Sequence, residues 1–389
     1  MPSKIVAQAV HAARRAFMAA CGAIPIRRER VVFSSFSGKS YSDNPRAISE
    51  RLHEMRPQAE IVWLMRDGAA GSLPGYARRA RPNSLRAIYL MATARAWVDN
   101  MPKPLYTVKR ARQFYVQTWH GDRGFKKMLY DAPDHPPGKP ILEERIADVM
   151  VAGSRFCEET FRTGFRFRGE VMQVGSPRND VLTLPAGQTR PGACARLGLD
   201  ENARYMLYAP TMRRQAARTH GLQPIQDIDL IRALDCLSAR DGCEYRCLVR
   251  CHSTALGLDG LPDDARVIDV SGYEDMADIL LASDVLITDY SSCAGDFALT
   301  GRQIALYQSD RESFEREERT FYFDIDASPY QAAFSQSELE ALLSRADARS
   351  AQHNDEEILA FYGCTETGHA AGRVCERIIE AIRRGGARS

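Results

Sequence analysis

The residues best suited to chemistry follow a short apolar run in the second half of the chain. Thr288 ends a predicted strand, and Asp289, Ser291 and Ser292 form a polar turn before a predicted helix. Backbone N–H groups, hydroxyls and the positive end of a helix dipole together bind anions such as phosphate. Ser, Thr and Asp are also common helix caps, so capping alone explains the turn about as well. No capping box starts at Ser292, because Gly295 stands three residues later, and this favours a phosphate site slightly.

Polar residues also follow four other predicted strands. They are His120 after residues 113–119, Arg178 and Asn179 after 171–174, Thr211 and Arg213 after 205–209, and His252 and Ser253 after 245–250. One polar residue after a strand is usually only loop, but the carboxyl ends of parallel strands meet at the edge where α/β folds bind ligands. Imidazole can accept a proton near neutral pH. The recurrence therefore predicts a shared site.

Two series of elements must position these residues. Apolar runs alternate with amphipathic segments from Arg30 onward, which is the βαβ rhythm of a parallel sheet covered on both faces. The first series has strands at 31–36, 61–65, 96–98, 113–119, 149–152 and 171–174, with helices at 44–55, 82–92, 141–150 and 154–163. The second has strands at 205–209, 245–250, 267–270, 285–288 and 304–307, with helices at 225–239, 274–282 and 292–299.

The domain boundaries follow from a change in composition. Residues 183–202 are rich in proline and glycine and are predicted to be a linker. It separates two Rossmann-like domains, 30–184 and 203–368. Three further helices are expected at 337–345, 356–362 and 369–384, and the segment 369–389 is expected to close the fold.

The N-terminal residues 1–29 form a basic amphipathic helix in this interpretation. Val6, Val10 and Phe17 recur at helical spacing with arginines around them. The apolar run is too short and interrupted for a transmembrane span. A helix resting on an anionic membrane surface and a helix packing on its own domain explain the pattern equally well.

Composition excludes several classes of protein. The 389 residues carry 52 Lys and Arg against 50 Asp and Glu, which argues against a nucleic-acid partner because phosphate contacts need a basic excess. The ten cysteines show no paired zinc spacing, although Cys243, Cys247 and Cys251 recur every four residues. Dinucleotide, Walker and nucleophile-elbow motifs are absent from the sequence.

Five segments carry a family resemblance. They are SGKSYSDNPR at 37–46, WHG at 119–121, GSPRND at 175–180, LYAPTMR at 207–213 and LITDYSS at 286–292. In this order they resemble the CDP-glycerol glycerophosphotransferases, which build teichoic acids and related capsule polymers, and the likeness extends to 296–297, 307–310 and 319–322. The resemblance implies an α/β fold of the GT-B class, in which two Rossmann-like doubly wound domains face a cleft. It also implies that 30–184 is the acceptor-side domain and 203–368 the nucleotide-donor domain.

The resemblance also implies a reaction and a set of site residues. Glycerol phosphate would pass from CDP-glycerol to a hydroxyl of a lipid-linked glycan or polyol-phosphate acceptor, releasing CMP. His120 is the expected base, His252 contacts the donor phosphates, and Asp289 orients a donor hydroxyl or a histidine. The other expected donor or phosphate ligands are Arg213, Thr211, Ser253, Thr288, Ser291 and Ser292. The expected acceptor-side or cleft residues are Trp119, Gly121, Asp122, Lys126, Arg178 and Asn179, of which the last two could instead brace the interdomain turn.

The sequence departs from the family pattern at two places. Asp122, Arg123 and Gly124 stand where relatives usually have threonine and proline, and Ser253 replaces a usual proline. A GT-B glycosyltransferase using another nucleotide-sugar and a non-catalytic membrane-associated assembly partner therefore remain alternatives. No metal or cofactor is expected beyond the CDP-linked donor, since dipoles, arginine and histidine can hold the charge. The expected location is the cytoplasm, peripherally on the inner face of the cell membrane, and homo-oligomerisation is left open.

Overall fold

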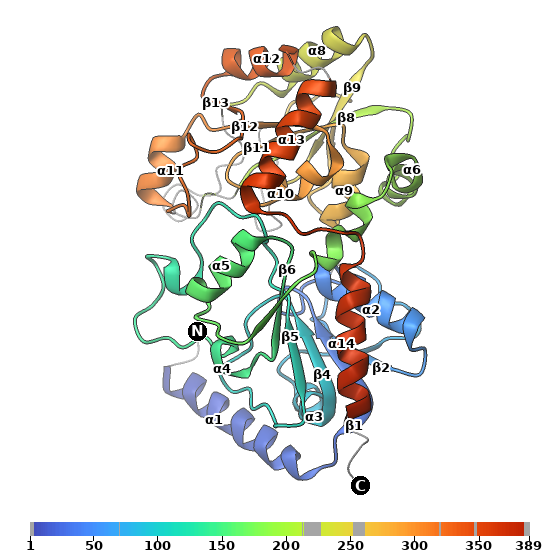
Figure 1. Cartoon of the computed structure of the whole chain (residues 1–389), viewed down its shortest axis with the longest axis vertical. Helices are drawn as coiled ribbons and strands as arrows, with labels where there is room; N and C mark the ends of the chain where they lie inside the picture. The colour runs from blue at the N-terminus through green and yellow to red at the C-terminus, as the bar shows by residue number, and fades with distance from the viewer. Residues whose placement is uncertain are drawn as a thin grey trace.

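The chain folds into two lobes stacked along its long axis (Figure 1). The computed structural model describes residues 4–69, 71–211, 213, 227–251, 261–318, 320–345 and 348–384. Each lobe contains one parallel sheet with helices on its faces. This is the expected doubly wound architecture, and the prediction of fold class is confirmed.

The N-terminal lobe is built on a seven-stranded parallel sheet in the order β3-β2-β1-β4-β5-β6-β7. The strands are β1 (Arg27–Ser34), β2 (Glu60–Leu64), β3 (Arg78–Ala80), β4 (Ala94–Asp99), β5 (Phe114–Gln117), β6 (Val149–Ala152) and β7 (Glu170–Gln173). Its helices are α1 (Lys4–Ala20), α2 (Asp43–Met55), α3 (Leu85–Thr93), α4 (Glu143–Ile146) and α5 (Arg155–Gly164), with short 3₁₀ turns at Cys21–Ala23 and Leu129–Asp131.

The C-terminal lobe has a six-stranded parallel sheet in the order β10-β9-β8-β11-β12-β13. The strands are β8 (Arg204–Ala209), β9 (Tyr245–Val249), β10 (Val267–Asp269), β11 (Val285–Thr288), β12 (Gln303–Tyr307) and β13 (Ala332–Ala333). The helices of this lobe are α6 (Ala186–Leu197), α8 (Leu230–Asp241), α9 (Met276–Ala282), α10 (Cys293–Phe297), α11 (Arg311–Glu317), α12 (Gln336–Arg345) and α13 (Ala348–Tyr362). The last helix of the chain is α14 (Ala370–Arg384).

Both sheets reverse their strand order at one place, and this explains where the motif residues gather. The order changes direction between β1 and β4 in one lobe and between β8 and β11 in the other. A doubly wound sheet binds ligands beyond the carboxyl ends of its strands at such a switch point. The loops after β8 and β11 carry Thr211, Arg213 and the Asp289–Ser292 turn. Topology therefore brings these segments together although they are about 80 residues apart in sequence.

The segment predicted to be a linker contains the 12-residue helix α6. Proline and glycine disfavour helix on intrinsic propensity, but Ala193 and Cys194 are fully buried in the core of the C-terminal lobe. Burial outweighs propensity here, as tertiary packing commonly does. The predicted helix 141–150 is wrong in extent, because only Glu143–Ile146 is helical and Val149 already begins β6.

Helix α1 is packed at one end and exposed at the other. Met18 and the following Cys21 are buried near α3, whereas Val6 and Val10 are 51% and 40% exposed. Among the described residues, no helix has the length and apolar character needed to cross a membrane. Packing on its own domain therefore accounts for the C-terminal half of the helix only.

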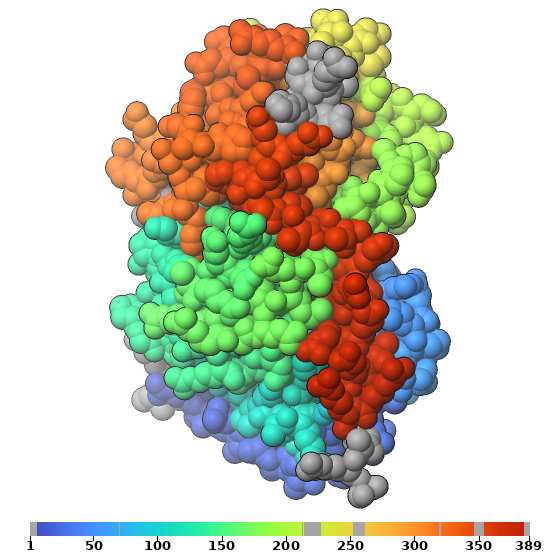
Figure 2. All heavy atoms as spheres, viewed as in Figure 1, coloured from blue at the N-terminus to red at the C-terminus, as the bar shows by residue number. Residues whose placement is uncertain are grey.

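Two crossings connect the lobes, and they lie side by side. The first runs through the 3₁₀ segment Pro177–Thr183, and the second links α13 to α14. The Asp180 carboxylate accepts hydrogen bonds from the backbone N–H groups of Ala370 and Ala371, both at 2.8 Å. Helix α14 then lies against the N-terminal lobe, so the red surface extends into the lower half of the molecule in Figure 2.

One side chain also joins the lobes by packing. Phe125 belongs to the N-terminal lobe by chain position but is fully buried in the core of the C-terminal lobe. Its ring lies 5.3 Å from that of Phe323 and 5.0 Å from that of Tyr330. Backbone hydrogen bonds flank it, from Tyr322 N to Phe125 O at 2.8 Å and from Lys127 N to Thr320 O at 2.9 Å. The loop after His120 is therefore anchored in the opposite lobe.

Candidate active site

The turn after β11 offers hydroxyl groups at the start of α10. Ser292 precedes the helix and makes no side-chain capping bond. Among the described residues, the partner of Ser291 Oγ is Cys293, whose N–H donates to it over a long 3.4 Å. Thr288 differs, because its hydroxyl donates to Ala209 O at 2.6 Å and is fully buried. The structure thus leaves Ser291 and Ser292 available to an anion and uses Thr288 to tie β11 to β8.

Asp289 organises the neighbouring loop. Its buried carboxylate accepts hydrogen bonds from Thr211 N at 2.9 Å and from Arg213 Nη1 at 2.8 Å. Arg213 is also held by Asp310, at 2.6 and 3.1 Å, and its guanidinium lies over the rings of Tyr290 and Phe314. Two carboxylates therefore fix the arginine beside the turn. Asp289 acts here as a positioning group for Thr211 and Arg213.

His120 is held in a geometry suited to a general base. Its Nδ1 lies 2.9 Å from the backbone oxygen of Asn100. A carbonyl oxygen can only accept, so Nδ1 carries the proton and Nε2 keeps a lone pair. Burial lowers the pKa of His120, although the hydrogen bond to Asn100 opposes the shift. The imidazole is therefore neutral, and able to accept a proton at Nε2, at neutral pH.

The backbone before His120 is constrained. Trp119 has a φ of 53°, in the left-handed region that non-glycine residues seldom adopt. The Trp119 N–H donates a hydrogen bond to the Gln117 side chain at 2.8 Å, and the Asn44 side chain donates one to the Trp119 carbonyl at 3.1 Å. The Phe36 ring packs edge-on against the imidazole, with 5.5 Å between ring centroids. Strain of this kind concentrates at functional sites, where surrounding contacts impose it.

The histidine loop lies directly against the serine turn of the other lobe. A methyl group placed on Gly121 would lie 3.6 Å from Ser292 Oγ, and one on Gly124 would lie 3.9 Å from Ser292 Cβ. Lys126 Nζ approaches Thr211 Oγ1 across the same interface, at 3.5 Å. A base, a cation and a pair of serine hydroxyls thus come together from two lobes. At these distances a methyl group on either glycine would make ordinary van der Waals contact with Ser292, so the two loops pack closely without a clash.

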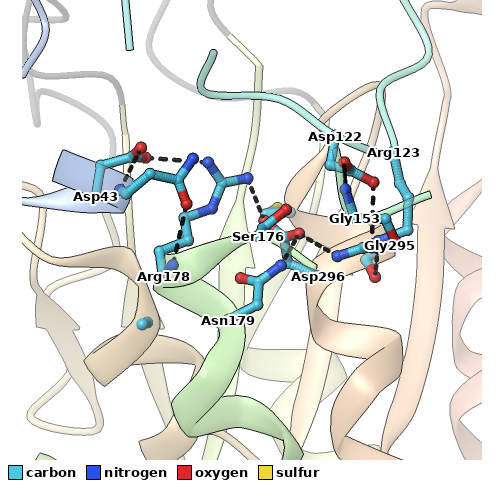
Figure 3. Close-up of polar contacts among 12 residues, drawn as sticks. Asp43, Asp122, Arg123, Gly153, Ser176, Arg178, Asn179, Gly295 and Asp296 are labelled. Atoms are coloured by element: carbon cyan, nitrogen blue, oxygen red, sulfur yellow. Dashed lines mark hydrogen bonds and ion pairs between the residues drawn. The ribbon is translucent and has the colours of Figure 1, made fainter. Parts of the chain in front are cut away.

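A buried ionic network that includes Arg123 joins the segment after His120 to α10 (Figure 3). The Arg123 side chain is fully buried and donates to Asp296 at 2.8 Å, to Glu366 at 3.1 Å and to Asp122 at 3.2 Å. Its Nε also donates to Gly295 O at 2.9 Å. Asp122 accepts a hydrogen bond from Gly153 N as well. Arg123 therefore ties the histidine loop to α10 and to the second crossing.

Arg178 and Asn179 extend the same network. Arg178 donates to Asp43 at 3.1 Å and to Asp296 at 2.9 Å, and Asn179 donates to Asp296 at 2.8 Å. The two cations lower the pKa of Asp296 despite its burial, whereas burial raises the pKa of Glu366 to about 7. Arg178, Asn179 and Asp122 were expected on the acceptor side. The side chains of Arg178 and Asn179 bond to Asp296 of the other lobe, in line with the other interpretation for these two residues. Asp122 instead holds Arg123 and Gly153 within the N-terminal lobe.

Sequence reasoning missed several residues that support this site. Arg123 was noticed only as a departure from the family pattern, and neither Glu366 nor Asn100 was singled out. The available signal was the unusual Asp122-Arg123 pair, because charged residues are seldom fully buried unless they are paired. Two other expected residues, His252 and Ser253, lie outside the described residues. Within the described ranges, no group of three His, Cys, Asp or Glu residues could hold a metal ion.

The comparisons with known proteins agree with this geometry. Residues 16–383 match the model of the CDP-glycerol:poly(glycerophosphate) glycerophosphotransferase family. A teichoic acid poly(glycerol phosphate) polymerase from Bacillus spizizenii is 31% identical, over 92% of this chain and 94% of its own length. A protein of that name from Bacillus subtilis is 33% identical over 78% of this chain, which covers 42% of the relative. A protein of the same name from Staphylococcus epidermidis is matched over 48% of its own length, so the chain spans about half the length of these two longer relatives.

A solved structure gives the same picture for the whole chain. The wall teichoic acid polymerase TagF superposes with a TM-score of 0.82 and 28% identity, over 98% of this chain and 96% of the other. A histidine-to-asparagine variant of TagF soaked with CDPG is also similar, with a TM-score of 0.79. The two lobes and their interlobe site define a GT-B transferase fold. The chain belongs to the CDP-glycerol:poly(glycerophosphate) glycerophosphotransferase family.

Proposed function

We propose that this protein transfers glycerol phosphate, or a related polyol phosphate, from a CDP-linked donor to a hydroxyl of a lipid-linked glycan or polymer. The product would belong to teichoic acid or capsule polysaccharide synthesis, and CMP would be released. The observation that carries the proposal is the contact between the His120-Gly121 loop and Ser292. Two features support the proposal: this loop carries an imidazole with a lowered pKa, and it approaches a turn whose hydroxyl and backbone donors suit phosphate.

The proposed reaction assigns a task to each group. The acceptor oxygen attacks the phosphorus bonded to glycerol, and its proton passes to His120 Nε2. The bond from that phosphorus to the bridging oxygen breaks, and CMP leaves with the electron pair. Lys126 and the hydroxyls of Ser291 and Ser292 stabilise the negative charge that develops on the phosphates. No step needs a metal ion, and the absence of a cofactor stays a prediction.

A panel of CDP-linked alcohols tests the reaction class. We expect CMP release from CDP-glycerol in the presence of a hydroxyl acceptor, because the family and the site both fit this donor. Mass spectrometry of CMP and of the elongated acceptor gives the readout. Thermal stabilisation by UDP-sugars with none by CDP-alcohols would instead favour a nucleotide-sugar glycosyltransferase. The same panel identifies which polyol is transferred.

We also propose that α1 rests on an anionic membrane surface at the inner face of the cell membrane. Val6 and Val10 are exposed on the same helix as Arg15, which is exposed as well. A helix with exposed apolar and basic residues binds anionic membranes by burying the former and pairing the latter with lipid charge. A membrane-bound enzyme would meet a lipid-linked acceptor where that acceptor resides.

Vesicle co-sedimentation tests the role of α1. The variant Val6→Asp, Val10→Asp is expected to lose most of its binding to anionic vesicles while its CMP release with a water-soluble acceptor stays unchanged. Val181→Asp is the matched control, because that valine is 40% exposed but lies outside α1. Equal sedimentation of both variants would show that α1 does not bind the membrane.

A further inference from the structure

A pocket lies at the amino ends of β4, β5 and β6, at the opposite end of these strands from the proposed active site. Its volume is about 420 Å³, and its charged lining residues are Arg95, Arg112, Asp148, Arg377, Glu380 and Arg384. These residues come from the start of β4, the segments before β5 and β6, and the end of α14. Figure 1 shows that this end of α14 points away from the C-terminal lobe. The pocket is therefore separate from the site between the lobes.

The two carboxylates of the pocket already have cationic partners. Asp148 accepts a hydrogen bond from Lys109 Nζ at 2.8 Å and another from Tyr115 N at 2.7 Å. Glu380 pairs with Arg377 at 2.9 Å and, more loosely, with Arg384 at 3.5 Å. Neither carboxylate forms an ion pair with Arg95 or Arg112. Asp148 offsets the charge of Arg95 only in part, because burial and the charge of Arg112 still lower the pKa of Arg95.

Arg95 is the strongest sign of a missing anion. It is only 8% exposed, and its Nε donates to Ala381 O at 2.6 Å. Among the residues that the structure describes, no carboxylate lies within ion-pairing distance of it. Burial lowers the pKa of Arg95, and the nearby charge of Arg112 lowers it further. Two guanidinium groups thus repel each other at a pocket wall, and one of them is buried, which is costly without a counter-charge.

Capping of α14 explains part of this arrangement. A cationic side chain near the C-terminus of a helix can donate hydrogen bonds to the last carbonyls of that helix. Arg95 does this for α14, because its Nε donates to Ala381 O. Among the described residues, the hydrogen-bond partner of the Arg95 guanidinium is Ala381 O through Nε, and this bond gives no reason for a second arginine beside it. An anion held between Arg95 and Arg112 accounts for both.

We infer that this pocket binds a phosphate ester between Arg95 and Arg112. Guanidinium groups match phosphate oxygens with paired hydrogen bonds, and the volume exceeds what a lone phosphate needs. The ester could be the headgroup of an anionic phospholipid or a soluble glycerol phosphate. The lipid source fits the surroundings, because Arg110 donates to the backbone oxygen of the exposed Ile24, just after α1, at 2.8 Å. The inference does not depend on the proposed transfer reaction.

Two binding assays on the full chain distinguish the sources. One is co-sedimentation with vesicles of phosphatidylcholine containing phosphatidylglycerol. The other is equilibrium dialysis of glycerol 3-phosphate with excess CMP, which fills the interlobe site. We expect Arg112→Glu to weaken binding about tenfold in at least one assay, as loss of a charge-assisted hydrogen bond predicts. Arg168→Glu is the control, because Arg168 is an exposed arginine of the same lobe that does not line the pocket.

The outcomes are distinct. A selective loss in the vesicle assay assigns the pocket to a lipid headgroup, and a selective loss in dialysis assigns it to a soluble ester. Equal binding by Arg112→Glu and Arg168→Glu in both assays overturns the inference. Arg95→Gln repeats the test on the buried partner, with its melting temperature measured to check folding. CMP release by Arg112→Glu, measured in parallel with a water-soluble acceptor, should match the wild type and reports on the transfer reaction separately.

Discussion

Replacing His120 with alanine is expected to lower kcat/KM for CMP release by about 10²–10⁴-fold, the usual contribution of a general base. The reason is that His120 Nε2 keeps a lone pair able to take the proton of the acceptor hydroxyl, because the Asn100 carbonyl fixes the tautomer of the ring. Initial rates with CDP-glycerol and a soluble acceptor give the measurement. His53→Ala is the matched control, since His53 is also half-buried and stacked on an aromatic ring but lies in α2.

The pH profile gives a second readout of the same assignment. Burial places the pKa of His120 below its ordinary value of about 6.5. A base is active when deprotonated, so the rate should hold as pH falls to 6.5 and decline only at lower pH. The alanine variant should lack this decline. Full activity in His120→Ala, or an acid limb that persists in it, would remove His120 as the base.

Replacing Asp296 with asparagine is expected to lower the free energy of unfolding by about 3–5 kcal/mol, the cost of breaking a buried ion pair from one side. Asn keeps the shape but leaves Arg123 and Arg178 without their shared carboxylate. Denaturant unfolding at pH 7 measures the change. Glu54→Gln removes the exposed pair with Arg51 and should cost less than about 1 kcal/mol.

The pH dependence of this effect has a defined sign. The folded protein holds the pKa of Asp296 below its ordinary value of about 3.9. Its stabilising contribution is therefore present above that value and is lost as pH falls through the lower, folded-state pKa. The gap between wild type and Asp296→Asn should persist at pH 5 and narrow only in stronger acid. A gap that is absent at pH 7 would show that Asp296 does not stabilise the lobes.

Much of the fold was predictable because its signals are local. The strand at 285–288 was predicted with the bounds it has in the structure, and Ser154 caps α5 as expected, accepting from Cys157 N at 3.0 Å. Continuous apolar runs mark strands that are buried on both faces. Element ends were less accurate: the helix predicted at 292–299 begins at Cys293 and passes at Ala298 into a 3₁₀ turn that ends at Thr300.

The partners of the site residues were not predictable from sequence. Arg178 and Asn179 follow a strand, as ligand-binding residues do, yet their side chains meet Asp296, more than 100 positions away. Only the folded chain shows that a carboxylate competes for them. The burial of Arg123 was unpredictable for the same reason, because its three carboxylate partners come from different segments of the chain that only the fold brings together.

The burial of Phe125 in the C-terminal lobe resists separation of the two lobes next to His120. Its ring sits in the opposite lobe five residues after His120, and withdrawing a phenylalanine from a core costs about 1.5–3 kcal/mol. If the lobes bent apart, Phe125 would have to leave that core before the His120 loop could move away from Ser292. Small motions of the lobes that keep Phe125 buried should leave the distance between His120 and the serine hydroxyls unchanged. The reacting groups would then move together while the rest of the molecule flexes.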